Sequence, residues 1–195
     1  MPATPDEFSR PYKGAGEFPK TFHTQCHCGT MHAVWLACQD PDTMFAILEY
    51  ISPLPMPKAV KLSIHFAKSV LHIAETDTAV AAILAAESWL SSPSKLTCQN
   101  AFDAAHEARN DGNTLSRGNI TSLTIARSGA NFTACHAAAT AWACGSGLSN
   151  YSDYTGSAAH TMRWALDGLK TNIETNWRIC EIIREHIANP FSKPE

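Results

Sequence analysis

The sequence predicts an all-α protein, specifically an antiparallel multi-helix bundle with an irregular N-terminal arm. Apolar residues recur at spacings of three and four in most segments, and no segment alternates as a strand would. Residues 79–145 are unusually rich in alanine, the best helix former, whose small side chain lets helices approach closely. With 195 residues and 45% hydrophobic composition, we expect an arm over 1–30 and one helical-bundle domain over 31–195.

The first half of the chain alternates helical segments with proline breaks. Four prolines and two glycines exclude a stable helix from the first 20 residues. Asp40-Pro41 is a typical capped helix start, with proline at the first helical position. Thr76-Asp77 predicts a connector between two helices and the cap of the second one. We expect helices at residues 31–38, 41–51, 58–75 and 78–90, with the proline-rich stretch 52–57 as a break.

The second half is punctuated by glycine and proline in the same way. Ser92-Pro93 repeats the cap-then-proline start, and Gly129 marks either a weak point or a close-packing site. The polar stretch 110–113 predicts a turn, residues 117–119 an interruption, and residues 145–156 a loop. The predicted helices lie at about 93–109, 120–144 and 157–188, the last with the clearest amphipathic period.

Charge and hydropathy exclude several classes of protein. The net charge is −3 with only 17% charged residues and no basic stripe, so we expect no nucleic-acid partner. No apolar run is long enough for a membrane span, and the first residues do not form a secretory signal. We therefore expect a cytoplasmic protein with free cysteines. The low charge favours extensive burial or a surface covered by another chain, which leaves a homo-oligomer open.

A cluster of cysteines and histidines lies just before the bundle. Thiolates and imidazoles are the ligands that zinc prefers, and four of them surround a tetrahedral ion. The spacing is not that of a zinc finger, because Cys-x-Cys replaces Cys-x-x-Cys. A metal here would fix the arm and would not drive catalysis. The candidate zinc ligands are His23, Cys26, Cys28 and His32, and the alternative is a loop that contains them by chance.

Further histidines and arginines stand out inside the helices because polar residues are sparse there. They could form a polar core or line a ligand pocket: His65, His106, Arg109, Arg127 and His136. The alternative is that each histidine bonds a neighbouring helix. No nucleophile arrangement, phosphate-binding loop or dinucleotide motif accompanies them, so we assign no catalytic residue.

The segment after the alanine-rich stretch has the aromatic and acidic character of a recognition surface. We expect Tyr151, Tyr154 and Arg163 to be accessible contacts, together with Asp153. An ordinary polar connector is the alternative interpretation of the same residues.

Several segments of the chain, the middle ones rich in alanine, follow one another in a definite order. The opening helix over 61–75 is followed by Ala82-Ile-Leu-Ala-Ala-Glu-Ser-Trp89 and by Ala104-Ala-His-Glu-Ala-Arg109. Next come Ala126-Arg-Ser-Gly129 with Ala134-Cys-His136, and then the tryptophan and isoleucine-rich end at 177–187. In this order the segments resemble a family of immunity proteins from bacterial polymorphic toxin systems. The resemblance spans roughly residues 58–187 and leaves the first 57 unmatched. Trp142 stands near a position where the family would have a histidine.

The resemblance implies a cytoplasmic helical protein that binds and neutralises a cognate protein toxin without catalysis. The alternative is a metal- or ligand-binding bundle, with or without enzymatic activity, that uses the cluster at 23–32 or the bundle histidines. A structural subunit of an oligomer is a third interpretation.

Overall fold

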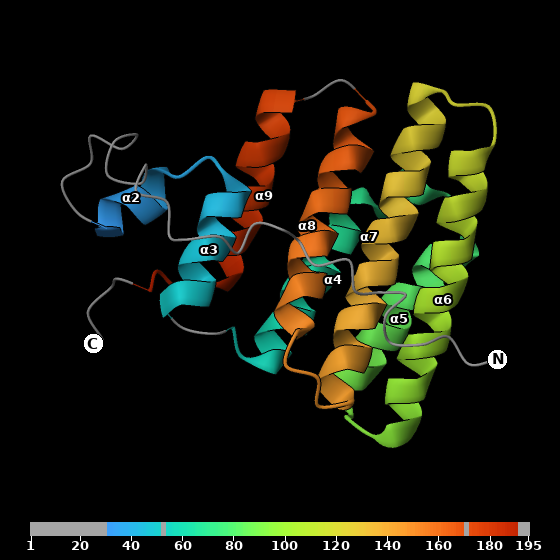
Figure 1. Cartoon of the computed structure of the whole chain (residues 1–195), viewed down its shortest axis with the longest axis horizontal. Helices are drawn as coiled ribbons and strands as arrows, with labels where there is room; N and C mark the ends of the chain where they lie inside the picture. The colour runs from blue at the N-terminus through green and yellow to red at the C-terminus, as the bar shows by residue number, and fades with distance from the viewer. Residues whose placement is uncertain (1–30, 52–53, 170–171, 191–195) are drawn as a thin grey trace.

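Helices make up all the regular structure in the residues that the computed structural model describes, which are 31–51, 54–169 and 172–190 (Figure 1). The all-α prediction is therefore confirmed. The described helices are α2 (Met31–Ala37), α3 (Pro41–Ile51), α4 (Met56–Ala74), α5 (Asp77–Ser91), α6 (Lys95–Arg117), α7 (Ser122–Gly145), α8 (Tyr151–Asp167) and α9 (Asn172–His186). The arm predicted over 1–30 lies outside the described residues.

Helix α7 is the centre of the bundle. It contacts α4, α5, α6 and α8, and Figure 1 shows it between α6 and α8, with α4 and α5 behind. Helices α3 and α9 lie on the far side of α8, where α9 also contacts α4. Fifteen of the 24 residues of α7 are buried, nearly all of them alanine or another small residue. The alanine-rich segment is thus the helix around which the others pack.

Close approach of helix backbones explains the small side chains of α7. A Cβ atom added to Gly129 would lie 2.6 Å from the backbone nitrogen of Ala165 in α8, so Gly129 is a close-packing site. Buried hydroxyl groups also join the helices. Thr133 donates to Thr161 of α8 at 3.2 Å, and Ser63 of α4 shares a hydrogen bond of 3.1 Å with Thr140. These contacts satisfy polar groups that burial would otherwise leave without partners.

Several predicted helix boundaries are confirmed by their caps. The amide of Thr43 donates to the Asp40 carboxylate at 3.0 Å, at the start of α3. The amide of Ala79 donates to the Thr76 hydroxyl at 3.3 Å, at the start of α5. The cap of α6, however, is Ser94, which forms a capping box with Thr97, whereas Ser92 ends α5. The prediction from Ser92-Pro93 was thus two residues early.

The turn predicted at 110–113 is wrong, because α6 continues to Arg117. Gly112 lies under the ring of Phe132, where an added Cβ would be 3.2 Å from the nearest ring carbon. Its carbonyl accepts from Ser128 at 2.9 Å, and Asp111 accepts from Thr78 at 2.6 Å. Contacts with α5 and α7 therefore hold this polar stretch in the helix.

The single helix predicted over 157–188 and the loop predicted over 145–156 are also wrong. Helix α8 begins at Tyr151 and ends at Asp167, and α9 begins at Asn172. Gly168 ends α8 against the start of α7, where an added Cβ would lie 2.8 Å from the Ser122 carbonyl oxygen. The interruption lets α9 pack on α3 and α4 instead of extending away from the bundle.

Candidate functional site

Three polar side chains from neighbouring helices interact electrostatically: Arg109 of α6, His136 of α7 and His160 of α8. Burial lowers the pKa of His136 to about 4, and the positive charges of Arg109 and His160 lower it further. Burial and the charge of Arg163 lower the pKa of His160, while Asp42 opposes that shift. Both imidazoles are therefore neutral at pH 7, whereas the guanidinium groups of Arg109 and Arg163 keep their charge.

His136 lies on the side of α7 between α6 and α8. Ile125, Phe132 and His136 recur at spacings of seven and four, so they share a face of α7. The Nδ1 atoms of His136 and of His106, one turn before Arg109 on α6, are buried without a hydrogen-bond partner among the described residues. Both rings therefore keep a nitrogen atom that no described residue uses.

Helix α8 continues this surface. Its backbone touches α7 at Ala165, beside Gly129, which fixes the register of the two helices. His160 and Trp164 lie one turn apart on α8, with ring centroids 5.1 Å apart in an edge-to-face arrangement. Trp164 is 48% exposed and Ile125 is 45% exposed. We call the surface formed by Ile125, Phe132, His136, His160 and Trp164 the α7–α8 face.

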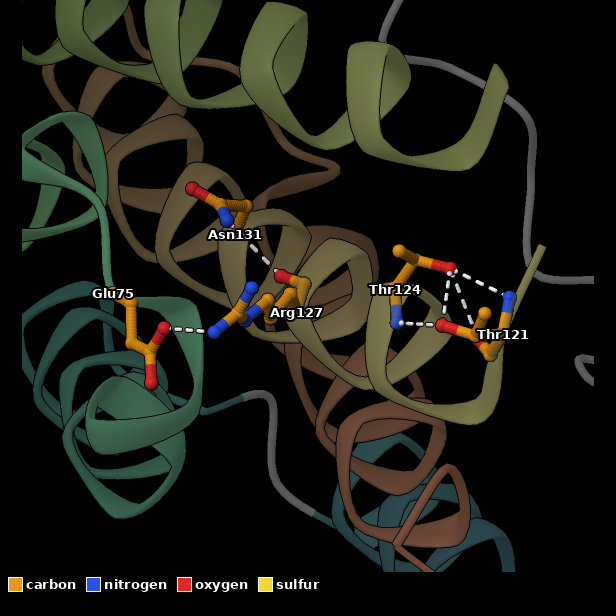
Figure 2. Close-up of polar contacts among 5 residues, drawn as sticks. All are labelled: Glu75, Thr121, Thr124, Arg127 and Asn131. Atoms are coloured by element: carbon orange, nitrogen blue, oxygen red, sulfur yellow. Dashed lines mark hydrogen bonds and ion pairs between the residues drawn. The ribbon is translucent and has the colours of Figure 1, made fainter. Parts of the chain in front are cut away.

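Arg127 belongs to a different, structural set of contacts. It forms an ion pair with Glu75, which ends α4 in the left-handed conformation at φ 53° (Figure 2). The backbone carbonyl of Arg127 accepts from the Asn131 side chain at 3.0 Å. Asn131 in turn accepts from Thr76 at 2.6 Å. This group joins the turn between α4 and α5 to α7.

His65 lies apart from the other predicted pocket residues. Its ring stacks on His186 of α9, with centroids 3.6 Å apart and planes 20° apart. Burial and the charge of His186 lower the pKa of His65, and burial lowers that of His186 as well. This pair joins α4 to α9, so the structure does not bring His65 into a common pocket with His136.

The predicted recognition segment is helical, and only part of it is accessible. Tyr154 is 3% exposed and packs edge-on against Trp142, so the expectation that it is accessible is wrong. Tyr151 donates to the Leu54 carbonyl at 2.8 Å and lines a pocket of about 210 Å³ with Phe45 and Leu48. Asp153 is half-buried, and burial raises its pKa.

Arg163, the fourth predicted contact residue, points to α3. Its guanidinium lies 3.6 Å from the Asp42 carboxylate, and its side chain is 22% exposed. It therefore links α8 to α3 and leaves little of its surface for another molecule.

No group of three or more histidine, cysteine, aspartate or glutamate side chains is placed for a metal ion in the described part of the chain. The predicted zinc ligands His23, Cys26 and Cys28 lie outside that part, as does the side chain of His32. None of the helices that the structure describes combines the length and hydropathy that a bilayer-spanning segment requires.

Sequence reasoning missed His160. Its neighbours in the predicted last helix follow an apolar period, and nothing in that period links it to His136 or Arg109. A search for polar residues next to Trp164 on the same helical face could have found it.

No protein-family model, curated protein or solved structure matches the chain.

Proposed function

We propose that this chain is an immunity-type protein that binds a cognate protein toxin in the cytoplasm and neutralises it without catalysis. The observation that supports this most is the α7–α8 face, where Ile125 and Trp164 expose large apolar side chains and Trp164 packs against the neutral ring of His160. Protein interfaces are enriched in aromatic residues and depleted of charge at their core, as this face is.

Two of the motifs that carry the resemblance to immunity proteins, Ala126–Gly129 and Ala134–His136, lie on α7. The second of them ends at His136 of the α7–α8 face. An inhibitor needs a complementary surface with a few anchor residues and no reacting group. Trp164 is the side chain best suited to be such an anchor, because tryptophan is enriched among residues that dominate binding energy.

The proposal predicts that a toxin domain is encoded next to the gene, and the experiment pairs the chain with that domain. Expression of that domain alone should stop bacterial growth, and co-expression of the chain should restore it. Titration calorimetry with an inactivated toxin domain should show a one-to-one complex. Trp164→Ala should weaken binding by roughly 10- to 100-fold, because an interface anchor is lost.

The matched control is Leu84→Ala. Leu84 is 57% exposed on α5, in the other layer of the bundle, so its loss should leave the affinity unchanged within about 0.5 kcal/mol. Absence of both binding and growth rescue by the wild-type chain would overturn the proposed function. Equal losses in the two variants would overturn the assignment of the α7–α8 face.

A further inference from the structure

Two cysteines from distant parts of the sequence meet where α9 packs against the segment between α2 and α3. Cys38 follows α2, and Cys180 lies in the middle of α9. The two side chains are neighbours, and both residues are buried. Both are present as free thiols.

Arg184 of α9 holds this contact in place. Its Nε atom donates to the Trp35 carbonyl at 3.1 Å, and its terminal nitrogen donates to the Cys38 carbonyl. Two hydrogen bonds from one guanidinium therefore fix the backbone at Trp35 and at Cys38 against α9. The Cys38 thiol can also donate to the Asp40 carbonyl, at 3.3 Å. The Cys38 backbone is thus anchored to α9 at Arg184, one helical turn after Cys180.

We propose that Cys38 and Cys180 are a peroxide-sensitive dithiol that closes reversibly to a disulfide. Neighbouring thiols on an anchored backbone can reach bonding distance by side-chain rotation. Cys38 has a small exposed fraction, 6%, and its chain neighbours Ala37 and Gln39 are exposed, whereas Cys180 is fully buried. A small oxidant therefore reaches Cys38 first.

The environment of the two sulfur atoms assigns their roles. The hydrogen bond from Cys180 and the charge of Arg184 lower the pKa of Cys38, although burial and the charge of Asp40 oppose this. The same hydrogen bond and burial raise the pKa of Cys180. Cys38 is therefore the thiolate that attacks, and Cys180 is the thiol that resolves the intermediate.

The chemistry balances with hydrogen peroxide as the oxidant. The Cys38 thiolate attacks one peroxide oxygen, the O–O bond breaks, and the departing hydroxide takes up a proton to become water. The Cys180 sulfur then attacks the Cys38 sulfenic acid. The S–S bond forms, the S–O bond breaks, and a second water leaves with the thiol proton. Two thiols lose two electrons in total, and peroxide becomes two waters.

The test uses the reduced full-length chain, treated with hydrogen peroxide at pH 7, alkylated and mapped by mass spectrometry. A cross-linked peptide pair containing Cys38 and Cys180 should appear, about 2 Da lighter than the sum of the reduced peptides, and dithiothreitol should remove it. C180S should stop at a Cys38 sulfenic acid that dimedone traps. C38S should leave Cys180 reduced and open to alkylation after unfolding.

The control variant is C144S, which removes a thiol whose pKa burial raises to about 12, and it should keep the cross-link. Circular dichroism of each variant before treatment establishes that it is folded. The proposal is overturned if the folded wild-type chain keeps both thiols reduced. It is equally overturned if Cys38 pairs with a different cysteine, or if C38S oxidises at Cys180 as fast as the wild type.

Discussion

Glycine has a hydrogen atom where alanine has a methyl group, and this difference decides how closely α7 approaches its neighbours. Gly129 meets backbone atoms of Ala165, which cannot move without shifting the whole of α8. Gly156, in the middle of α8, has no atom within 4 Å of the position that a Cβ would occupy. The two glycines therefore play opposite roles, although both lie inside helices.

The same substitution at these two glycines should have effects of opposite sign. Gly129→Ala should lower the free energy of unfolding by about 2 kcal/mol or more, because the added methyl group overpacks a rigid contact. Gly156→Ala should raise it by roughly 0.5–1 kcal/mol, because alanine favours the helix and nothing obstructs it. Urea unfolding followed by circular dichroism measures both. A stabilised Gly129→Ala variant would contradict the close contact of α7 and α8.

Helix caps stabilise individual helices of the bundle, and two of these caps differ in their surroundings. Thr76 caps α5 and also donates to Asn131, a residue with 0% exposure. Ser94 caps α6 through an exposed capping box with Thr97. Loss of the Thr76 hydroxyl therefore leaves a buried acceptor without its partner, whereas water can replace the Ser94 hydroxyl.

Thr76→Ala should accordingly lower the free energy of unfolding by roughly 2–3 kcal/mol, of which about 1 kcal/mol is the cap itself. Ser94→Ala should lower it by about 1 kcal/mol. Thr76→Ser, which keeps the hydroxyl, should restore most of the loss. Denaturant titrations of the three variants measure these changes. Equal losses of unfolding free energy in Thr76→Ala and Ser94→Ala would contradict the role given to Asn131.

Local signals in the sequence predicted most helices, because caps and prolines act within a few residues. The starts of α3 and α5 could be read from Asp40-Pro41 and Thr76 for that reason. The extension of α6 through Gly112 could not, since it depends on Phe132 and Ser128 of another helix. The end of α8 at Gly168 depends in the same way on the start of α7.

The candidate site was only partly predictable for a related reason. His136 and Arg109 stand out because polar residues are rare in the alanine-rich stretch. Their neighbour His160, and the pairing of His65 with His186, follow from contacts between helices that are distant in the sequence. The accessibility of Tyr154 was wrongly predicted because the start of α8 was read as a loop.

Among the residues that the structure describes, four histidines have a folded-state pKa that is lowered, mainly by burial: His65, His136, His160 and His186. Below pH 6.5 these histidines take up protons in the unfolded chain but stay neutral in the folded chain. The free energy of unfolding therefore decreases as the pH falls. For His136 this loss continues until about pH 4, where the folded chain is protonated as well.

We therefore expect the free energy of unfolding to fall between pH 6.5 and pH 4, and His136→Gln to reduce that slope. A single histidine changes the slope by at most about 1.4 kcal/mol per pH unit. Leu84→Ala, which removes an exposed side chain that does not titrate, is the control and should leave the slope as it is in the wild type. Urea unfolding at several pH values provides the measurement. A wild-type slope that persists in His136→Gln would contradict the assignment.

The central position of α7 also has a consequence for synthesis on the ribosome. Three of the helices that enclose α7 precede it in the chain, and the fourth, α8, follows it. While translation pauses anywhere before Tyr151, the glycine and threonine side of α7 that receives α8 stays open to solvent and to other nascent chains. The bundle therefore closes only after α8, which follows α7 in the chain, has been made.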